Sequence, residues 1–197
     1  MRIGLDIDDT ISNTHFILMK YAYKYNAENG NDELLKYNTN DFTKIFGWDD
    51  EKVYNFFRTY YLDALKEIEP KFGVKETLTK LKKDGHEIIF ITIRDDNECG
   101  GEGEAYRLTY EWLKKYEIPY DELNVAISNK KDFCSKNNID IFMDDSEKTC
   151  KAVSELGIKT FIAMNPYNLE FKDDNIINIY SMNEFYNEVL NIQKSRH

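Results

Sequence analysis

Three apolar stretches of the sequence are each followed at once by polar side chains of the kinds that bind metals and phosphate. These residues are Asp6, Asp8 and Thr10 in G-L-D-I-D-D-T, Thr92 and Arg94 in I-I-F-I-T-I-R, and Asp144 and Asp145 in I-F-M-D-D-S. If the apolar stretches are parallel strands, their carboxyl ends meet at one edge of the sheet, where open α/β sheets bind ligands. The sequence therefore predicts one polar site assembled from three distant segments.

Carboxylates gathered in this way repel one another unless a cation lies among them. The three cysteines and three histidines of the chain show no metal-ligand spacing, so oxygen atoms are the expected ligands. An oxygen-rich site of this kind suits Mg²⁺, which keeps several waters and shares its shell with substrate phosphate. We therefore expect a magnesium-assisted phosphoryl reaction.

The residue types suggest a division of roles in such a reaction. Asp6 is the expected nucleophile, which forms an aspartyl-phosphate. Asp8 is the expected acid that protonates the leaving alkoxide and later activates water. Thr92 would donate to a phosphoryl oxygen, and Lys130, at the start of an expected helix, would balance negative charge.

Each of these residues also has a plainer structural explanation. Aspartate, serine and threonine after a strand are common turn and helix-cap residues, and Ser146 is an expected cap of the next helix. A single lysine is usually solvated, and Lys131 lies one step from Lys130. Arg94 either reaches the substrate phosphate or forms a salt bridge. The first and third strand ends nevertheless carry pairs of acids, and the second carries a hydroxyl group. This combination favours a functional site over turn chemistry alone.

Short apolar runs and amphipathic helical patterns follow one another over the last two-thirds of the chain, as in a parallel α/β sheet. The expected strands are 2–5, 86–92, 124–128, 139–143 and 159–164. Gly85 and Gly157 are expected helix terminators, and a last helix is expected over 183–193. The pattern predicts a Rossmann-like parallel sheet with helices on both faces.

About 80 residues separate the first two expected strands, far more than a crossover helix needs. This interval has helical periodicity and a single proline, Pro70, at its end. We therefore expect residues 15–72 to form a small inserted helical cap, and residues 1–14 and 73–197 to form the core. Aromatic residues of the cap either stack on a nucleotide base or form the cap's own core. Those considered for stacking are Phe16, Phe42, Phe46 and Trp48.

Composition excludes several other classes of protein. The 197 residues carry 26 Lys and Arg against 36 Asp and Glu, and the net charge of −10 argues against binding a nucleic-acid polymer or an anionic membrane. No apolar run approaches the roughly 18 residues of a membrane span, and Asp6 and Asp8 interrupt any signal peptide. We expect a cytoplasmic protein with reduced cysteines, and a homodimer is allowed. The acidic, glycine-rich residues 95–104 are expected to form a solvated flexible loop.

The motifs together resemble those of the haloacid dehalogenase-like phosphohydrolases. The matching segments are D-I-D-D-T, I-T at 91–92, the lysine of S-N-K-K, and M-D-D-S. The resemblance implies a Rossmann-like core with a type-one (C1) cap inserted after the first motif. It also implies Mg²⁺ held by Asp6, the backbone carbonyl of Asp8, and Asp145, with Asp144 in a supporting role. In the alternative assignment Asp144 binds the metal and Asp145 supports it.

Within that family, I-T-x-R at 91–94 and W-L at 112–113 resemble the bacterial branch related to 5′(3′)-deoxyribonucleotidases. The resemblance implies a Mg²⁺-dependent phosphatase that acts on a small phosphate ester, with a nucleoside monophosphate as the leading candidate. Thr10 and Arg94 are then expected substrate contacts. The alternatives are a phosphatase or phosphotransferase for a sugar or cofactor phosphate, and a nucleotide-binding module with an idle site.

Overall fold

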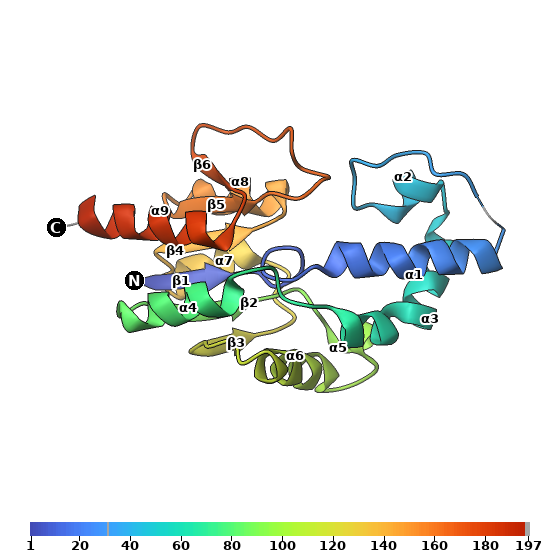
Figure 1. The fold of residues 1–197 in the computed structure, drawn as a ribbon, viewed down its shortest axis with the longest axis horizontal. Coiled ribbons are helices and arrows are strands. Elements are labelled where there is room, and N and C mark those ends of the chain that lie inside the picture. The colour runs from blue at the N-terminus through green and yellow to red at the C-terminus, as the bar shows by residue number, and fades with distance from the viewer. Residues whose placement is uncertain (31, 196–197) are drawn as a thin grey trace.

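The computed structural model describes residues 1–30 and 32–195. In this part of the chain, parallel strands form one six-stranded sheet in the order β3-β2-β1-β4-β5-β6 (Figure 1). The strands are β1 (Arg2–Leu5), β2 (Glu87–Ile91), β3 (Glu122–Asn124), β4 (Ile141–Asp144), β5 (Lys159–Ala163) and β6 (Ile176–Ile179). The direction of strand order reverses beside β1, which is where such sheets bind ligands. The predicted Rossmann-like α/β class is confirmed.

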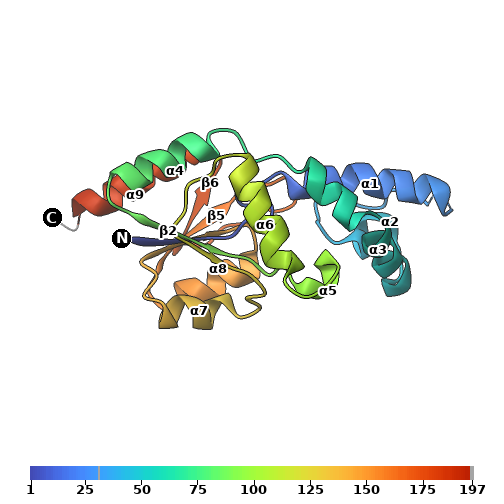
Figure 2. The same cartoon turned by 90° about the horizontal axis from the view of Figure 1, so that it is seen from below.

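Helices cover both faces of the sheet (Figure 2). On one face lie α4 (Val74–Lys83), α6 (Glu104–Lys115) and α9 (Met182–Ser195), and on the other lie α7 (Lys130–Lys136) and α8 (Glu147–Ser154). Residues of β2 alternate between the two cores, with Ile88 and Phe90 in one and Ile89 and Ile91 in the other. Burial on both faces explains why this strand reads as a continuous apolar run. None of the described helices is both long and apolar enough to cross a membrane.

The register of the central strands positions the predicted acids. Leu5 of β1 pairs with Phe90 of β2 and with Met143 of β4. The backbone N–H of Asp6 then donates to the Met143 carbonyl at 2.9 Å. Asp6 and Asp144 therefore leave neighbouring strands at the same level of the sheet.

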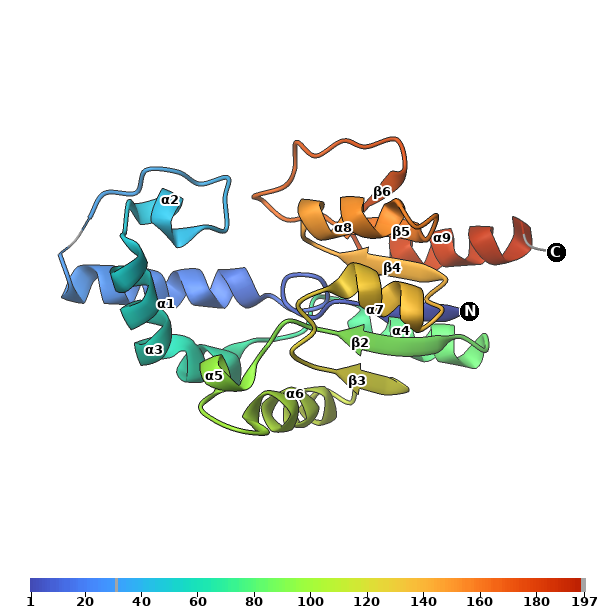
Figure 3. The same cartoon turned by 180° about the vertical axis from the view of Figure 1, so that it is seen from behind.

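The chain between β1 and β2 forms a group of helices beyond the carboxyl ends of the strands (Figures 1 and 3). We call α1 (Thr14–Glu28), α2 (Phe42–Phe46) and α3 (Asp50–Glu67) the helical lobe. Its interior is aromatic, and the stacked rings of Phe46 and Trp48 lie 4.6 Å apart between centroids. Its two connections run side by side, since Ser12 pairs with Pro70 in an antiparallel bridge. Closure of the lobe over the site as a cap, with the boundaries expected above, stays a prediction.

The edges of the sheet differ from expectation. The strand expected at 124–128 lies earlier, at Glu122–Asn124, because Ala126 adopts a left-handed conformation with φ of 57° that ends the extended run. Strand β6 was not predicted. Its sequence I-I-N-I is short, and the two central residues are only half-buried, so it gives no strong apolar signal.

Residues 95–104 correct the expectation of a flexible loop. They contain the short helix α5 (Asp96–Cys99), and the Asp95 side chain accepts from the Glu98 N–H at its start. The Asp96 carboxylate accepts from the N–H groups of Gly103 and Ala105 at 2.8 and 3.0 Å. The acidic residues therefore order the segment by binding its own backbone.

Candidate active site

Lys130 joins the carboxyl ends of β1 and β4. Its Nζ lies 2.5 Å from Asp6 Oδ1 and 2.7 Å from Asp144 Oδ2. The three side chains are at most 6% exposed, so each charge depends on the others. Lys131 instead extends to Glu155 at the surface. The structure thus places Lys130, and not Lys131, at the site.

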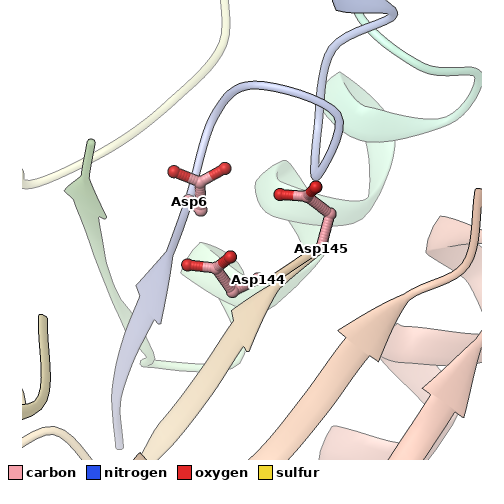
Figure 4. A group of neighbouring side chains, drawn as sticks. All are labelled: Asp6, Asp144 and Asp145. Carbon is pink, nitrogen blue, oxygen red and sulfur yellow. The ribbon is translucent and has the colours of Figure 1, made fainter. Parts of the chain in front are cut away.

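Asp6, Asp144 and Asp145 bring carboxylate oxygens within 4.8 Å of one another (Figure 4). Asp144 also accepts the N–H of Ser146 at 2.9 Å, and Asp145 accepts the hydroxyl of Tyr167 at 2.7 Å. Oxygen donors gathered around one point suit a hard divalent cation. The residues present therefore fit the expected metal.

The acids carry more negative charge than one lysine balances. The pKa of Asp6 is raised to about 7, mainly by burial. Lys130 opposes this rise, and the charges of Asp144 and Asp8 add to it. Burial, with the charges of Asp144 and Asp6, also raises the pKa of Asp145 well above its ordinary range. Burial lowers the pKa of Lys130, but the two aspartates beside it more than reverse this, so the net pKa is raised and the lysine stays cationic.

Asp8 is held by a bidentate ion pair with Arg94. The guanidinium Nε lies 2.7 Å from Asp8 Oδ2, and Nη2 lies 2.6 Å from Oδ1. The hydroxyl of Thr14 donates to Asp8 Oδ1 at 2.6 Å. Burial raises the pKa of Asp8, but the charge and hydrogen bonds of Arg94 outweigh it, so the net pKa is lowered. Arg94 thus makes the salt bridge, the second of its two expected roles.

Two predicted hydroxyl groups lie behind the acids. Thr10 Oγ1 donates to Asp6 Oδ2 at 3.0 Å, and the side chain is 1% exposed. Thr92 is fully buried and accepts the N–H of Arg94 at 3.3 Å. The position of Thr10 favours orienting Asp6, and its expected contact with substrate stays a prediction. Donation from Thr92 to a phosphoryl oxygen stays a prediction.

A cavity of about 540 Å³ lies over the acids, between the edge of the sheet and the helical lobe. The lobe contributes a mainly apolar wall, which comprises Leu18, Phe42, Val53, Phe57 and Tyr61. Of the aromatic residues considered for stacking, Phe42 lines the cavity, whereas Phe46 and Trp48 are buried inside the lobe and Phe16 is 74% exposed. A cavity of this size suits a small ligand with an apolar part.

Sequence reasoning missed several residues that line or support the cavity. Asp9, at φ of 57°, accepts the N–H of His15 at 2.7 Å and thereby caps the first turn of α1. The His15 ring packs edge-on against Tyr167, with centroids 5.3 Å apart. Ser128 and Glu98 also line the cavity. Only Asp9 and Ser128 lie inside the quoted motifs, so the spacing offered no signal for the others.

The fold is shared with solved structures of haloacid dehalogenase-like proteins. A haloacid dehalogenase-like hydrolase from Streptococcus pneumoniae matches with a TM-score of 0.67 at 12% identity, and the match covers 95% of this chain and 97% of that one. The chain therefore shares the fold of such proteins, and its acids follow β1 and β4 of that fold. The resemblance expected from the motifs is confirmed.

Relatives of the chain by sequence carry the name of nucleotidases. A nucleotidase of Clostridium acetobutylicum is 27% identical over 187 residues, which cover 94% of this chain and 92% of the relative. A Bacillus subtilis protein provisionally named a nucleotidase is 27% identical over 181 residues, which cover 91% and 88%. No model of a protein family matches the chain. The relatives support the prediction of a phosphoric monoester hydrolase.

Lys130→Met is expected to lower the free energy of unfolding by about 3–5 kcal/mol near pH 8, because Asp6 and Asp144 are left buried without their cation. Near pH 5 the loss should be smaller, since Asp6 then takes up a proton. Urea unfolding at both pH values measures the change. Lys131→Met removes a surface pair with Glu155 and should cost less than about 1 kcal/mol. Similar losses in the two variants would contradict this assignment.

Proposed function

We propose that this chain is a Mg²⁺-dependent phosphatase that hydrolyses a phosphate monoester, with a 5′-nucleotide as its preferred class of substrate. The observation that carries the proposal is the Asp6 carboxylate, bound to Lys130 at the cavity wall with Asp8 two residues further along. An acid aimed into a cavity and flanked by a lysine is equipped to form an acyl-phosphate. The nucleotidase names of the relatives support the choice of substrate.

Asp6 and Asp8 divide the chemistry between them. A carboxylate oxygen of Asp6 attacks phosphorus and forms the aspartyl-phosphate as the bond to the leaving oxygen breaks. Asp8 gives a proton to that leaving oxygen. In the second half-reaction Asp8 takes a proton from water, which attacks phosphorus and releases phosphate and the Asp6 carboxylate. Lys130 favours the ionised form of Asp6 and offsets charge on the phosphoryl group.

The ion pair of Asp8 with Arg94 holds Asp8 in its proton-accepting form. Before the first half-reaction Asp8 must carry a proton, and this requires a weaker contact with Arg94. Both side chains line the cavity, so a dianionic phosphate there competes with Asp8 for the guanidinium. Loss of part of the ion pair raises the pKa of Asp8. Substrate binding then prepares the acid.

The proposed metal ligands are Asp6, the backbone carbonyl of Asp8, and Asp145. Asp144 is already engaged by Lys130 and by the N–H of Ser146, whereas the Asp145 carboxylate accepts one tyrosine hydroxyl. Asp144 is therefore better placed to support the site than to bind the ion. When bound, Mg²⁺ neutralises the acids and polarises the phosphoryl oxygens.

Addition of Mg²⁺ is expected to raise the melting temperature, because an ion that binds the folded state stabilises it. The rise should be larger near pH 8 than near pH 5.5. Asp6 and Asp145 have raised pKa values, so protons compete with the metal at acid pH. Asp145→Asn should remove most of the shift, and Asp174→Asn, at an exposed acid, should keep it. Equal shifts in the two variants would argue against the ligand set.

Hydrolysis of p-nitrophenyl phosphate tests the activity itself. We expect turnover with Mg²⁺, little with EDTA, and a loss of at least about 1000-fold in Asp6→Asn, which lacks the nucleophile. Circular dichroism checks that the variant is folded, and Asp174→Asn serves as the active control. Equal rates with Mg²⁺ and EDTA, or full activity in Asp6→Asn, would refute the proposal.

Phe42 carries the preference for a nucleotide. It begins α2, lines the cavity, and lies 5.1 Å from Phe56 between ring centroids. Stacking on a base contributes about 1–3 kcal/mol. Phe42→Leu should therefore raise KM for a nucleoside monophosphate about 5- to 10-fold without changing KM for glycerol phosphate. Phe46→Leu, in the same helix but inside the lobe, should leave both KM values near wild type. A parallel rise for both substrates would favour a non-nucleotide ester.

A further inference from the structure

The segment 95–104, which the proposed reaction leaves without a role, brings an acid to the cavity. Its helix α5 packs against α3 of the helical lobe (Figure 3). Glu98 of α5 lines the cavity beside Phe57 and Tyr61 of α3. The Asp95 cap and the hydrogen bonds of Asp96 fix the backbone on either side of it. The backbone at Glu98 is thus held in place, and the residue is exposed.

The described lining of the cavity offers no lysine or arginine that is free of an aspartate partner to bind a second anionic group. Seven of its lining residues are acids, namely Asp6, Asp8, Asp9, Asp41, Glu98, Asp144 and Asp145. Among the described lining residues the lysine and arginine are Lys130 and Arg94, and both are engaged by aspartates. Burial lowers the pKa of His15, so it adds no positive charge at neutral pH. One phosphate is compensated by the lysine, the arginine and a metal ion, and another anion is not.

Glu98 lines the same cavity as Asp8, the proposed proton donor. Burial, together with the charges of Asp95 and Asp8, raises the pKa of Glu98. Asp8 is the proposed proton donor to the leaving oxygen. The lining of this cavity also includes apolar side chains, among them Phe57 and the 62% exposed Ile93. An uncharged leaving group meets favourable contacts there, and an anionic one meets a carboxylate.

We propose that Glu98 is a specificity-determining residue that rejects esters whose leaving group carries a second phosphate or a carboxylate. The inference rests on the proposed phosphatase function and narrows its substrates to monophosphates of uncharged leaving groups. Like charges placed close together in a partly buried site cost enough to discriminate between substrates. The same charge disfavours a phosphomutase reaction that passes through a bisphosphate.

Two matched substrate pairs test the inference on the Mg²⁺-loaded protein. They are adenosine 5′-monophosphate with adenosine 3′,5′-bisphosphate, and glycerol phosphate with 3-phosphoglycerate. Wild type should prefer the first member of each pair by about tenfold in kcat/KM, and added KCl should shrink this ratio. Glu98→Gln should reduce the ratio about fivefold, and Glu98→Lys should reduce it further. Glu102→Gln, at an exposed acid in the same segment, should leave it unchanged.

The outcomes separate this inference from the proposed function. A smaller ratio in Glu98→Gln than in wild type, with Glu102→Gln unchanged, supports it. Turnover of monophosphates with no preference in wild type, or with the same ratio in Glu98→Gln and wild type, overturns the role of Glu98 and leaves the phosphatase intact. Absence of hydrolysis of every ester, p-nitrophenyl phosphate included, overturns both.

Discussion

A buried lysine shared by two aspartates is the interaction on which the rest of the site depends. Lys130 reaches Asp6 and Asp144 together because β1 and β4 are neighbours in parallel register and leave the sheet at the same level. Charges at such low exposure are costly unless they are paired, so sheet order, register and the start of α7 must all agree. With Asp145 beside them, the negative charges outnumber the lysine. This surplus is the physical reason that a divalent cation fits the site.

Asp8 belongs to a second pair that is anchored separately. Arg94 holds it from the end of β2, and Thr14 holds it from the first turn of α1 in the helical lobe. Asp6, in contrast, is fixed from the core alone, by Lys130 and Thr10. A displacement of α1 relative to the sheet therefore acts on Asp8 and leaves Asp6 in place. The geometry connects Asp8, the proposed proton-transfer group, rather than Asp6, the proposed nucleophile, to the position of the lobe.

The sequence predicted the central strands and the residues at their ends, because strands buried on both faces read as apolar runs and their carboxyl ends are fixed by the sheet. The edge strands were predicted poorly: β3 was misplaced and β6 was missed, since both are short and half-buried. The sequence also did not predict which partners individual side chains contact. Whether Lys130 or Lys131 points inward depends on the phase of α7, and whether Arg94 meets phosphate or Asp8 depends on distances across the sheet. Glu98 was not recognised as a cavity-lining residue, because the acidic, glycine-rich sequence around it resembles a solvated loop.

The acidic residues behind the net charge of −10 act at two scales, that of the whole chain and that of the cavity. At the scale of the whole chain it disfavours polyanions, because phosphates need lysine and arginine to neutralise them. At the scale of the cavity, seven acids act on a ligand at contact distance, where salt screens them less than it screens surface charges. In the proposed reaction, Lys130, Arg94 and a metal ion would compensate one phosphate group. The same electrostatic rule therefore disfavours nucleic acid at the surface and, in the proposed site, limits how much charge a small substrate can bring inside.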